Sequence, residues 1–428
     1  MQDKQRSVDS VSEAAADAAP VFARSVRLLT LGGLWLPPES APEAGRQLYA
    51  KYSLCMGVFT LVNVLGEAGG MVFVDAPMPV RANNLISTLW RFLALAIFHQ
   101  SLAHVRSLQA LRAEAERMAR MRHGDHGFGV VEHNVAALQK RARLVVNRLV
   151  LAYICWFTYS STGVVTTPAV DWMASGVRPS PFMASKFWLL SEPDTPAKEV
   201  VMALSQAVSQ YTCTVINVGY ITFWGGLTIF LSFQARILGV LVRSIPFRAS
   251  TAGPTSEKMV KKRLVHCITL QQDILNAAEE VNNAVRAFIL ILFLVSLCFI
   301  GVMLFLISGA GGANGVLMAT LMILICTNCL VGISTYSSDQ LRTMNEEVVH
   351  DVMATDWSSA TPALQRLVYI MLMRATKPPS LWCWRAFRVG LPTWLQVTHL
   401  HIVHLSFLKN KQECPQHTCD FSSPFHIL

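Results

Sequence analysis

Two ionisable side chains, Glu67 and Arg91, lie well inside apolar stretches of the sequence. Glu67 comes seven residues before the end of one stretch, and Arg91 eight residues after the start of the next. At 1.5 Å rise per helical residue, both lie ~10–12 Å deep. Opposite charges at equal depth on antiparallel neighbours offset the cost of burying either one. We therefore expect an ion pair; the alternative is that both side chains reach the membrane surface by snorkelling.

Histidines and cysteines gather near the end of the chain: His399, His401, His404, Cys414, His417 and Cys419. A zinc site needs fixed tetrahedral geometry and buried partners behind its ligands, which this stretch does not indicate. Cys326 and Cys329 have the C-x-x-C spacing but sit inside an apolar run, where packing is the simpler role. We expect neither a metal site nor a cofactor.

The sequence contains no motif typical of an enzyme. It has no glycine-rich phosphate loop, no metal-binding histidine pair on a helix and no Gly-x-Ser-x-Gly elbow. We therefore expect no catalytic residues and no nucleic-acid partner. An unrelated polytopic transporter or membrane enzyme is the alternative from another class.

The elements that position these side chains are apolar helices. The chain is 52% hydrophobic and only 15% charged, whereas about 25% charge is usual in soluble domains. Apolar runs near 20 residues match the length that crosses ~30 Å of hydrocarbon as a helix. We predict spans at 52–74, 83–105, 144–165, 200–231, 287–308 and 315–336, and a weaker one at 386–408. The run at 200–231 exceeds one bilayer thickness, so part of it should tilt or project.

Basic residues predict the orientation of these spans. Of the 36 Lys and Arg residues, 29 fall before the first span or in alternate loops, and six fall on the opposite side. The rich side is cytoplasmic by the positive-inside rule. The sequence thus predicts an all-α polytopic membrane protein with seven transmembrane helices, a cytoplasmic amino terminus and an extracellular carboxyl terminus. This orientation is opposite to that of a G-protein-coupled receptor, whose usual motifs are also absent.

We divide the chain into six segments. Residues 1–20 form a polar, disordered cytoplasmic head, and residues 21–38 an interfacial amphipathic helix ending at Gly32 and Gly33. Residues 39–336 contain six spans and their cytoplasmic loops. Residues 337–385 form a cytoplasmic anchor helix region, 386–408 the seventh helix, and 409–428 an extracellular tail.

Three stretches resemble the insect odorant receptor family. Gly33-Leu-Trp-Leu-Pro-Pro38 is similar to an element before the family's first span, and Cys267-Ile-Thr-Leu-Gln-Gln-Asp-Ile-Leu275 to its cytoplasmic anchor, with Gln271 where His is frequent. The most specific stretch begins with Ser337-Ser-Asp-Gln-Leu341 and ends at Val397, and several residues between them also match the family pattern. These are Trp357, Leu364, Arg366, Met371, Arg374, Lys377, Pro378, Leu381 and Leu395-Gln-Val397. The resemblance covers about residues 22–397.

This resemblance implies an odorant-gated, non-selective cation channel. Family members assemble as tetramers with a shared co-receptor subunit through the cytoplasmic anchor, and their seventh helix lines the pore. By resemblance, the subunit anchor here includes Trp357, Arg366, Arg374, Lys377 and Pro378. Trp357 and the basic residues could equally be interfacial anchors. The cytoplasmic segment between the fourth and fifth spans is shorter than the co-receptor's, so the resemblance implies a tuning subunit in the plasma membrane of a sensory neuron dendrite.

A volatile ligand is small and apolar, so its site should be a closed cavity lined by aromatic and Met side chains with few polar groups. Helix directions select candidates in the outer halves of the spans. They are Thr88, Trp90, Arg91, Trp156, Tyr159, Ser160, Thr162, Met202, Gln206, Gln210, Tyr211, Phe299, Met303, Met318 and Met322. The alternative for each is packing or contact with lipid. We expect the polar members to turn away from lipid.

The related gustatory receptors are the closest alternative family. Their usual closing motif begins with Thr-Tyr in the last helix, whereas Thr335 and Tyr336 end the sixth span here. After Val397 the sequence also departs from the odorant receptor pattern and places three histidines where the pore helix should continue. Protonated histidines would oppose cation conduction. We hypothesise that residues from Thr398 onward are not the native pore helix.

Overall fold

The computed structural model describes residues 21–37, 41–73, 78–121, 123–176, 195–251, 253–309, 314–384, 387–396 and 399. Nearly all of them are helical. The helices are α2 (Ala23–Leu31), α3 (Glu43–Phe73), α4 (Met78–Ala103), α5 (Val105–Arg120), α6 (Glu132–Ser175), α7 (Pro196–Arg243), α8 (Pro254–Gly309), α9 (Asn314–Met353) and α10 (Pro362–Ala375). Short 3-10 turns are η1 (Gly124–His126), η2 (Gly129–Val131), η3 (Phe247–Thr251) and η4 (Trp357–Ser359). One hairpin pairs β1 (Trp382–Cys383) with β2 (Phe387–Arg388).

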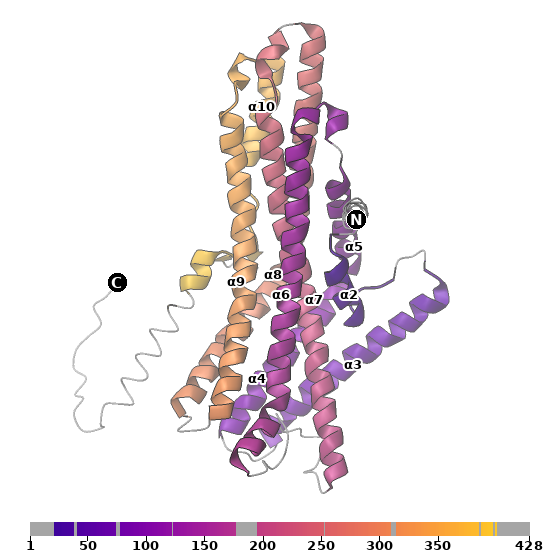
Figure 1. Ribbon diagram of the computed structural model, residues 1–428, viewed down its shortest axis with the longest axis vertical. Helices are drawn as coiled ribbons and strands as arrows, with labels where there is room; N and C mark the ends of the chain where they lie inside the picture. The colour runs from indigo at the N-terminus through magenta and orange to yellow at the C-terminus, as the bar shows by residue number, and fades with distance from the viewer. Residues whose placement is uncertain are drawn as a thin grey trace, which may run out of the picture.

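Four long helices, α6 to α9, run along the long axis of the molecule, and α3 crosses them obliquely (Figure 1). Helix α7 lies at the centre, packed against α2, α4, α6, α8 and α9. Its most apolar stretch is 83% buried, against 33–56% for the other candidate spans. A helix that is apolar all round needs protein or lipid on every side, and here protein supplies most of the cover. The other long helices leave one apolar face open.

Five helices in the described part of the chain are long and apolar enough to cross a membrane. They include the residue ranges Glu43–Phe73, Asn84–Ala103, Gly129–Gly163, Val200–Arg243 and Pro254–Val302. Each overlaps one of the first five predicted spans, and Val200–Arg243 contains its span completely. The sixth predicted span lies in the first half of α9. The structure does not describe most of the side chains of that half. The predicted class, an all-helical protein with several membrane-capable helices, is confirmed.

Helix α2 packs against α6 and α7. It ends at Leu31, directly before Gly32, and Gly33 adopts a φ of +79°. Phe22 and Trp35 are buried and make edge-on contacts with Phe223 of α7, at ring-centroid distances of 5.8 and 5.5 Å. The aromatic side chains around this helix are therefore covered by protein.

The predicted start of the seventh helix at Ala386 is wrong. Residues 387–388 form β2, and the next helix begins at residue 391. The Asp339 carboxylate accepts a hydrogen bond from the Leu391 N–H at 2.6 Å, and Ser338 Oγ donates to the Val389 carbonyl at 2.8 Å. A Cβ on Gly390 would meet Asp339 Oδ1 at 2.7 Å, so a larger residue there would have to displace the carboxylate that binds Leu391. Helix α9 thus sets where the last helix begins, and residues beyond 399 lie outside the described part.

Candidate functional site

The ion pair that the sequence suggested is present at the α3–α4 contact. Arg91 Nη1 lies 2.5 Å from Glu67 Oε2, and both side chains are almost completely buried. Ser87, one turn before Arg91, hydrogen-bonds to the guanidinium and donates to Glu67 Oε1 at 3.3 Å. On the other side, Arg91 Nε donates to Ser209 Oγ of α7 at 2.8 Å. The guanidinium therefore ties three helices together with its charge neutralised.

An aromatic stack begins at the residue next to Arg91. The rings of Trp90 and Phe157 are stacked with centroids 5.8 Å apart, and Phe157 stacks on Tyr153 at 5.8 Å. Tyr153 donates a hydrogen bond to the Cys329 carbonyl of α9 at 3.1 Å. Trp90 and Phe157 are buried, and within the described part of the chain Trp90 Nε1 has no hydrogen-bond partner. An apolar wall with a single free donor suits a small apolar molecule that carries one acceptor.

We name the residues Glu67, Trp90, Arg91, Phe157 and Ser209 the Trp90–Arg91 cluster. It stands where α3, α4, α6 and α7 meet. Charge is compensated within the cluster, so a neutral ligand beside it meets no unpaired charge. That is the electrostatic condition under which an apolar compound can compete with packing side chains.

The other predicted ligand residues differ in how far they are buried. Thr88, Ser160, Met202, Gln206 and Phe299 are buried, and Trp156 and Gln210 are half-buried. Thr88 is occupied by a hydrogen bond to the Asn84 carbonyl at 2.8 Å. The side chains of Met303, Met318 and Met322 lie outside the described residues.

Three predicted ligand residues point outward: Tyr159, Thr162 and Tyr211. Tyr159 is 64% exposed and Tyr211 38% exposed in this chain. The hydroxyl groups of Thr162 and Tyr211 lie 2.8 Å apart, and Thr162 also donates to the Thr158 carbonyl at 2.8 Å. Mutual hydrogen bonding lets such groups remain on the outer face.

Sequence reasoning missed Tyr153, Phe157, Ser87 and Ser209. The inward face of α6 carries residues 153, 157, 160 and 161, a helical spacing that was visible in the sequence. We instead chose Trp156 and Tyr159 by residue type. Ser209 could have been found in the same way, because it follows the buried Met202 and Gln206 at helical spacing.

The predicted subunit anchor forms a small module on α8 and α9. Trp357 lies edge-on to Tyr369 at 5.2 Å, and Gln271 Nε2 of α8 donates to the Met371 carbonyl at 3.2 Å. Helix α10 ends at Ala375, before Pro378 and Pro379, as proline requires. The basic side chains of the module, Arg366, Arg374 and Lys377, are exposed. The 337–385 region is thus the end of α9, a turn, α10 and a hairpin strand, and not one helix.

Comparison with known proteins agrees with this arrangement. The family model described as 7tm Odorant receptor matches residues 82–401. Odorant receptor 63a of Drosophila melanogaster is 27% identical over 162 residues, which are 36% of this chain and 39% of that protein. The matched part therefore spans about two fifths of that relative.

Solved structures share the fold over almost the whole chain. The insect olfactory receptor OR5 from Machilis hrabei in complex with eugenol superposes with a TM-score of 0.76 at 13% identity, covering 91% of this chain and 97% of that one. A second structure of the same receptor, described without eugenol, gives a TM-score of 0.75 at 13% identity, with 90% and 96% covered. At this identity the likeness establishes the fold alone.

Proposed function

The chain belongs to the 7tm odorant receptor family, and from that membership we propose that it is a tuning subunit of an odorant-gated, non-selective cation channel. The subunit assembles with a co-receptor into a heterotetramer in the plasma membrane of olfactory neuron dendrites. The single observation that carries the ligand assignment is the Trp90–Phe157–Tyr153 stack with an unpaired indole N–H beside a neutralised ion pair. The structure of OR5 in complex with eugenol supports a small-molecule site in this fold.

The ligand we propose is a small, neutral, largely apolar volatile with one hydrogen-bond acceptor. The ligand stacks against Trp90 or Phe157 and accepts the Trp90 Nε1 hydrogen bond. The buried candidates Ser160, Met202, Gln206 and Phe299 complete the wall, with Thr88, Trp156 and Gln210 at its edge. Arg91 keeps the neighbouring carboxylate neutralised and does not bind the ligand itself.

The test of this function is electrical. We expect oocytes expressing this chain together with a co-receptor to give inward cation currents when a panel of volatiles is applied, and cells with the co-receptor alone to lack those responses. Trp90→Phe keeps the ring and removes the donor. It should raise the half-maximal concentration of an acceptor-bearing agonist by about tenfold, the cost of one hydrogen bond, and change that of a pure hydrocarbon little. Equal effects on both ligands would show that Trp90 does not donate a hydrogen bond to the ligand.

Orientation is the second part of the proposal. The excess of Lys and Arg on one side supports a cytoplasmic amino terminus and seven spans. An epitope placed at residue 2 should be hidden on intact cells, and one within residues 178–195 should be accessible. The reverse labelling pattern would reject both the orientation and the channel model that depends on it.

Assembly through the anchor is the third part. Helix α10 sits at the far end of the long helices from the end of α8 and the start of α9 (Figure 1), and the basic residues in it or just after it, Arg366, Arg374 and Lys377, are exposed. Guanidinium groups form paired contacts with carboxylates across interfaces. The module formed by η4, α10 and the hairpin therefore offers a cationic face for a neighbouring subunit. Gustatory reception is the alternative function, and the position of Thr335-Tyr336 in α9, and not in the last helix, argues against it.

A further inference from the structure

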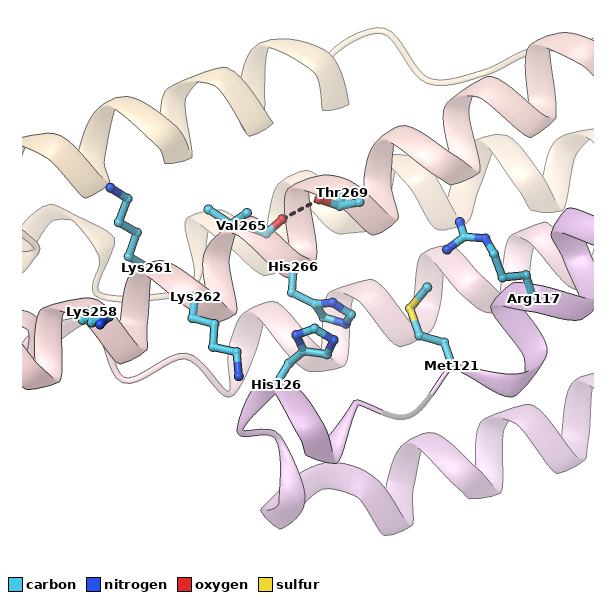
Figure 2. A pocket seen from close by; sticks show the side chains of 9 residues that line it. All are labelled: Arg117, Met121, His126, Lys258, Lys261, Lys262, Val265, His266 and Thr269. Atoms are coloured by element: carbon cyan, nitrogen blue, oxygen red, sulfur yellow. Dashed lines mark hydrogen bonds between the residues drawn. The ribbon is translucent and has the colours of Figure 1, made fainter.

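A hollow of about 610 Å³ lies between α5, η1 and the first turns of α8, at a distance from the Trp90–Arg91 cluster along the bundle. Its lining is Arg117, Met121, His126, Lys258, Lys261, Lys262, Val265, His266 and Thr269. We call it the basic pocket. Figure 2 shows the rings of His126 and His266 lying over one another, with Lys262 on one side and Arg117 on the other. No carboxylate is among the described residues that line it.

The lysines of the basic pocket have little to bind. Lys258 and Lys261 make no ion pair or hydrogen bond in the part of the chain that the structure describes, and both are exposed. Lys262 Nζ donates one hydrogen bond, to the Asp125 carbonyl at 3.0 Å. Since a carbonyl oxygen carries no net charge, three ammonium groups within two turns of α8 remain uncompensated.

Arg117 differs from these lysines. Its guanidinium hydrogen-bonds to Glu114, one turn before it, and lies 2.6 Å from Asp273 Oδ2 of α8. These carboxylates raise the pKa of Arg117 above its usual range. Arg117 therefore fixes α5 to α8, while the lysines supply the open charge.

Two stacked histidine rings, His126 and His266, lie beside the lysines. The His126 and His266 rings are stacked with centroids 4.0 Å apart, and His123 Nδ1 lies 3.0 Å from His266 Nε2. Burial lowers the pKa of His266, and that of its neighbour His123, to about 4. A neutral imidazole offers one N–H donor and one acceptor, so His266 can hydrogen-bond to a ligand without adding charge.

The basic pocket also lies far from the apolar part of α8. His266 precedes the start of the predicted span at residue 287 by 21 residues, which is ~30 Å along a continuous helix. With the orientation given under the proposed function, the pocket is in the cytoplasm and beyond easy reach of a lipid headgroup. A ligand there comes from solution.

We propose that the basic pocket binds a soluble, multiply phosphorylated anion. Clustered ammonium groups bind phosphate groups well. A ligand with several phosphates fits better than one with a single carboxylate, because it can form an ion pair with each of the three lysines. The volume lies within the ordinary range for small-molecule sites. A bound anion would join η1 and the end of α5 to α8, so occupancy would stabilise the cytoplasmic projection of the channel subunit.

Binding is measured on the detergent-purified full chain with inositol hexakisphosphate as the soluble probe and dioctanoyl phosphatidylinositol 4,5-bisphosphate as the lipid probe. The test variant is Lys258→Gln with Lys262→Gln. The matched control, Arg106→Gln with Arg141→Gln, removes two exposed charges on α5 and α6 outside the pocket. Thermal unfolding without probe verifies that both variants fold, since the changed side chains are on the surface.

The expected result is saturable binding of inositol hexakisphosphate that raises the Tm of the wild-type chain. The lysine variant should lose about tenfold or more in affinity, as expected when charge-assisted contacts are removed, and the arginine control should change less than about twofold. Absence of binding, or equal losses in the two variants, would overturn the proposal. Binding of the lipid probe alone would reject the soluble source. These measurements need no channel current, so the odorant-channel proposal can fail independently.

Discussion

The Trp90–Arg91 cluster and the basic pocket both assemble polar side chains from several helices, but they treat charge in opposite ways. In the cluster, one guanidinium meets one carboxylate at 2.5 Å, and two serines take up further polar contacts. In the basic pocket, three ammonium groups make no ion pair with a described carboxylate, and none of the lining residues is acidic. The charges of the first site are paired within the protein, and those of the second can pair with a ligand.

The difference follows from the solvent around each site. A single charge in hydrocarbon costs several kcal/mol, so the cluster is stable only when its charges balance within the protein. A lysine in water keeps its hydration, and leaving it unpaired costs little. Uncompensated charge is therefore affordable only in the projecting part of the bundle, where it can bind an anion from solution.

The largest expected effect comes from breaking the ion pair. Glu67→Gln and Arg91→Gln each leave a buried charge without its partner, which costs roughly 3–5 kcal/mol. The double variant leaves no charge and should recover much of that loss. Surface expression and Tm of the four proteins in a double-mutant cycle measure the coupling. Additive losses would show that the two side chains do not interact as the structure has them.

A smaller effect is expected at Ser209. Ser209→Ala removes the hydrogen bond that Arg91 Nε donates to α7 and leaves that N–H unsatisfied, at a cost of about 2 kcal/mol for a hydrogen bond to a charged group. Ser205→Ala, on an exposed position of the same helix, is the matched control. Tm values of the purified proteins should fall for the first variant only. Equal Tm values would mean that Arg91 reaches another acceptor.

The smallest effect concerns His123 beside the basic pocket. Its folded-state pKa of about 4 lies below the ordinary 6.5, so the unfolded chain binds the extra proton more readily. The stability contributed by neutral His123 is complete above pH 6.5 and declines as the pH falls toward 4. One proton gives a slope of at most about 1.4 kcal/mol per pH unit. His123→Gln should flatten the Tm profile between pH 6.5 and 4; an unchanged profile would contradict the shift.

Helical spacing and charge in the sequence were enough to predict the class of the protein and the pairing of Glu67 with Arg91. The length of an apolar run is a local property of the sequence, and it must match the thickness of the bilayer. The equal depth of Glu67 and Arg91 follows from counting residues along two helices. Residue type also predicted two helix ends, that of α2 at Gly32 and that of α10 before Pro378. These features depend on neighbours in sequence and on solvent.

The three-dimensional packing decided which face of each helix turns inward. Residue type favoured Trp156 and Tyr159, whereas the fold buries Tyr153 and Phe157, because Trp90 of α4 and Cys329 of α9 lie on that side. Which face meets which partner depends on every helix in the bundle.

The beginning of the last helix and the basic pocket were likewise beyond the sequence alone. Leu391 begins a helix because Asp339, 52 positions earlier, accepts its N–H. His126 and His266 are 140 positions apart by number and become stacked only when η1 folds against α8. Contacts between segments so distant leave no local pattern, since their energy appears only once the helices have packed.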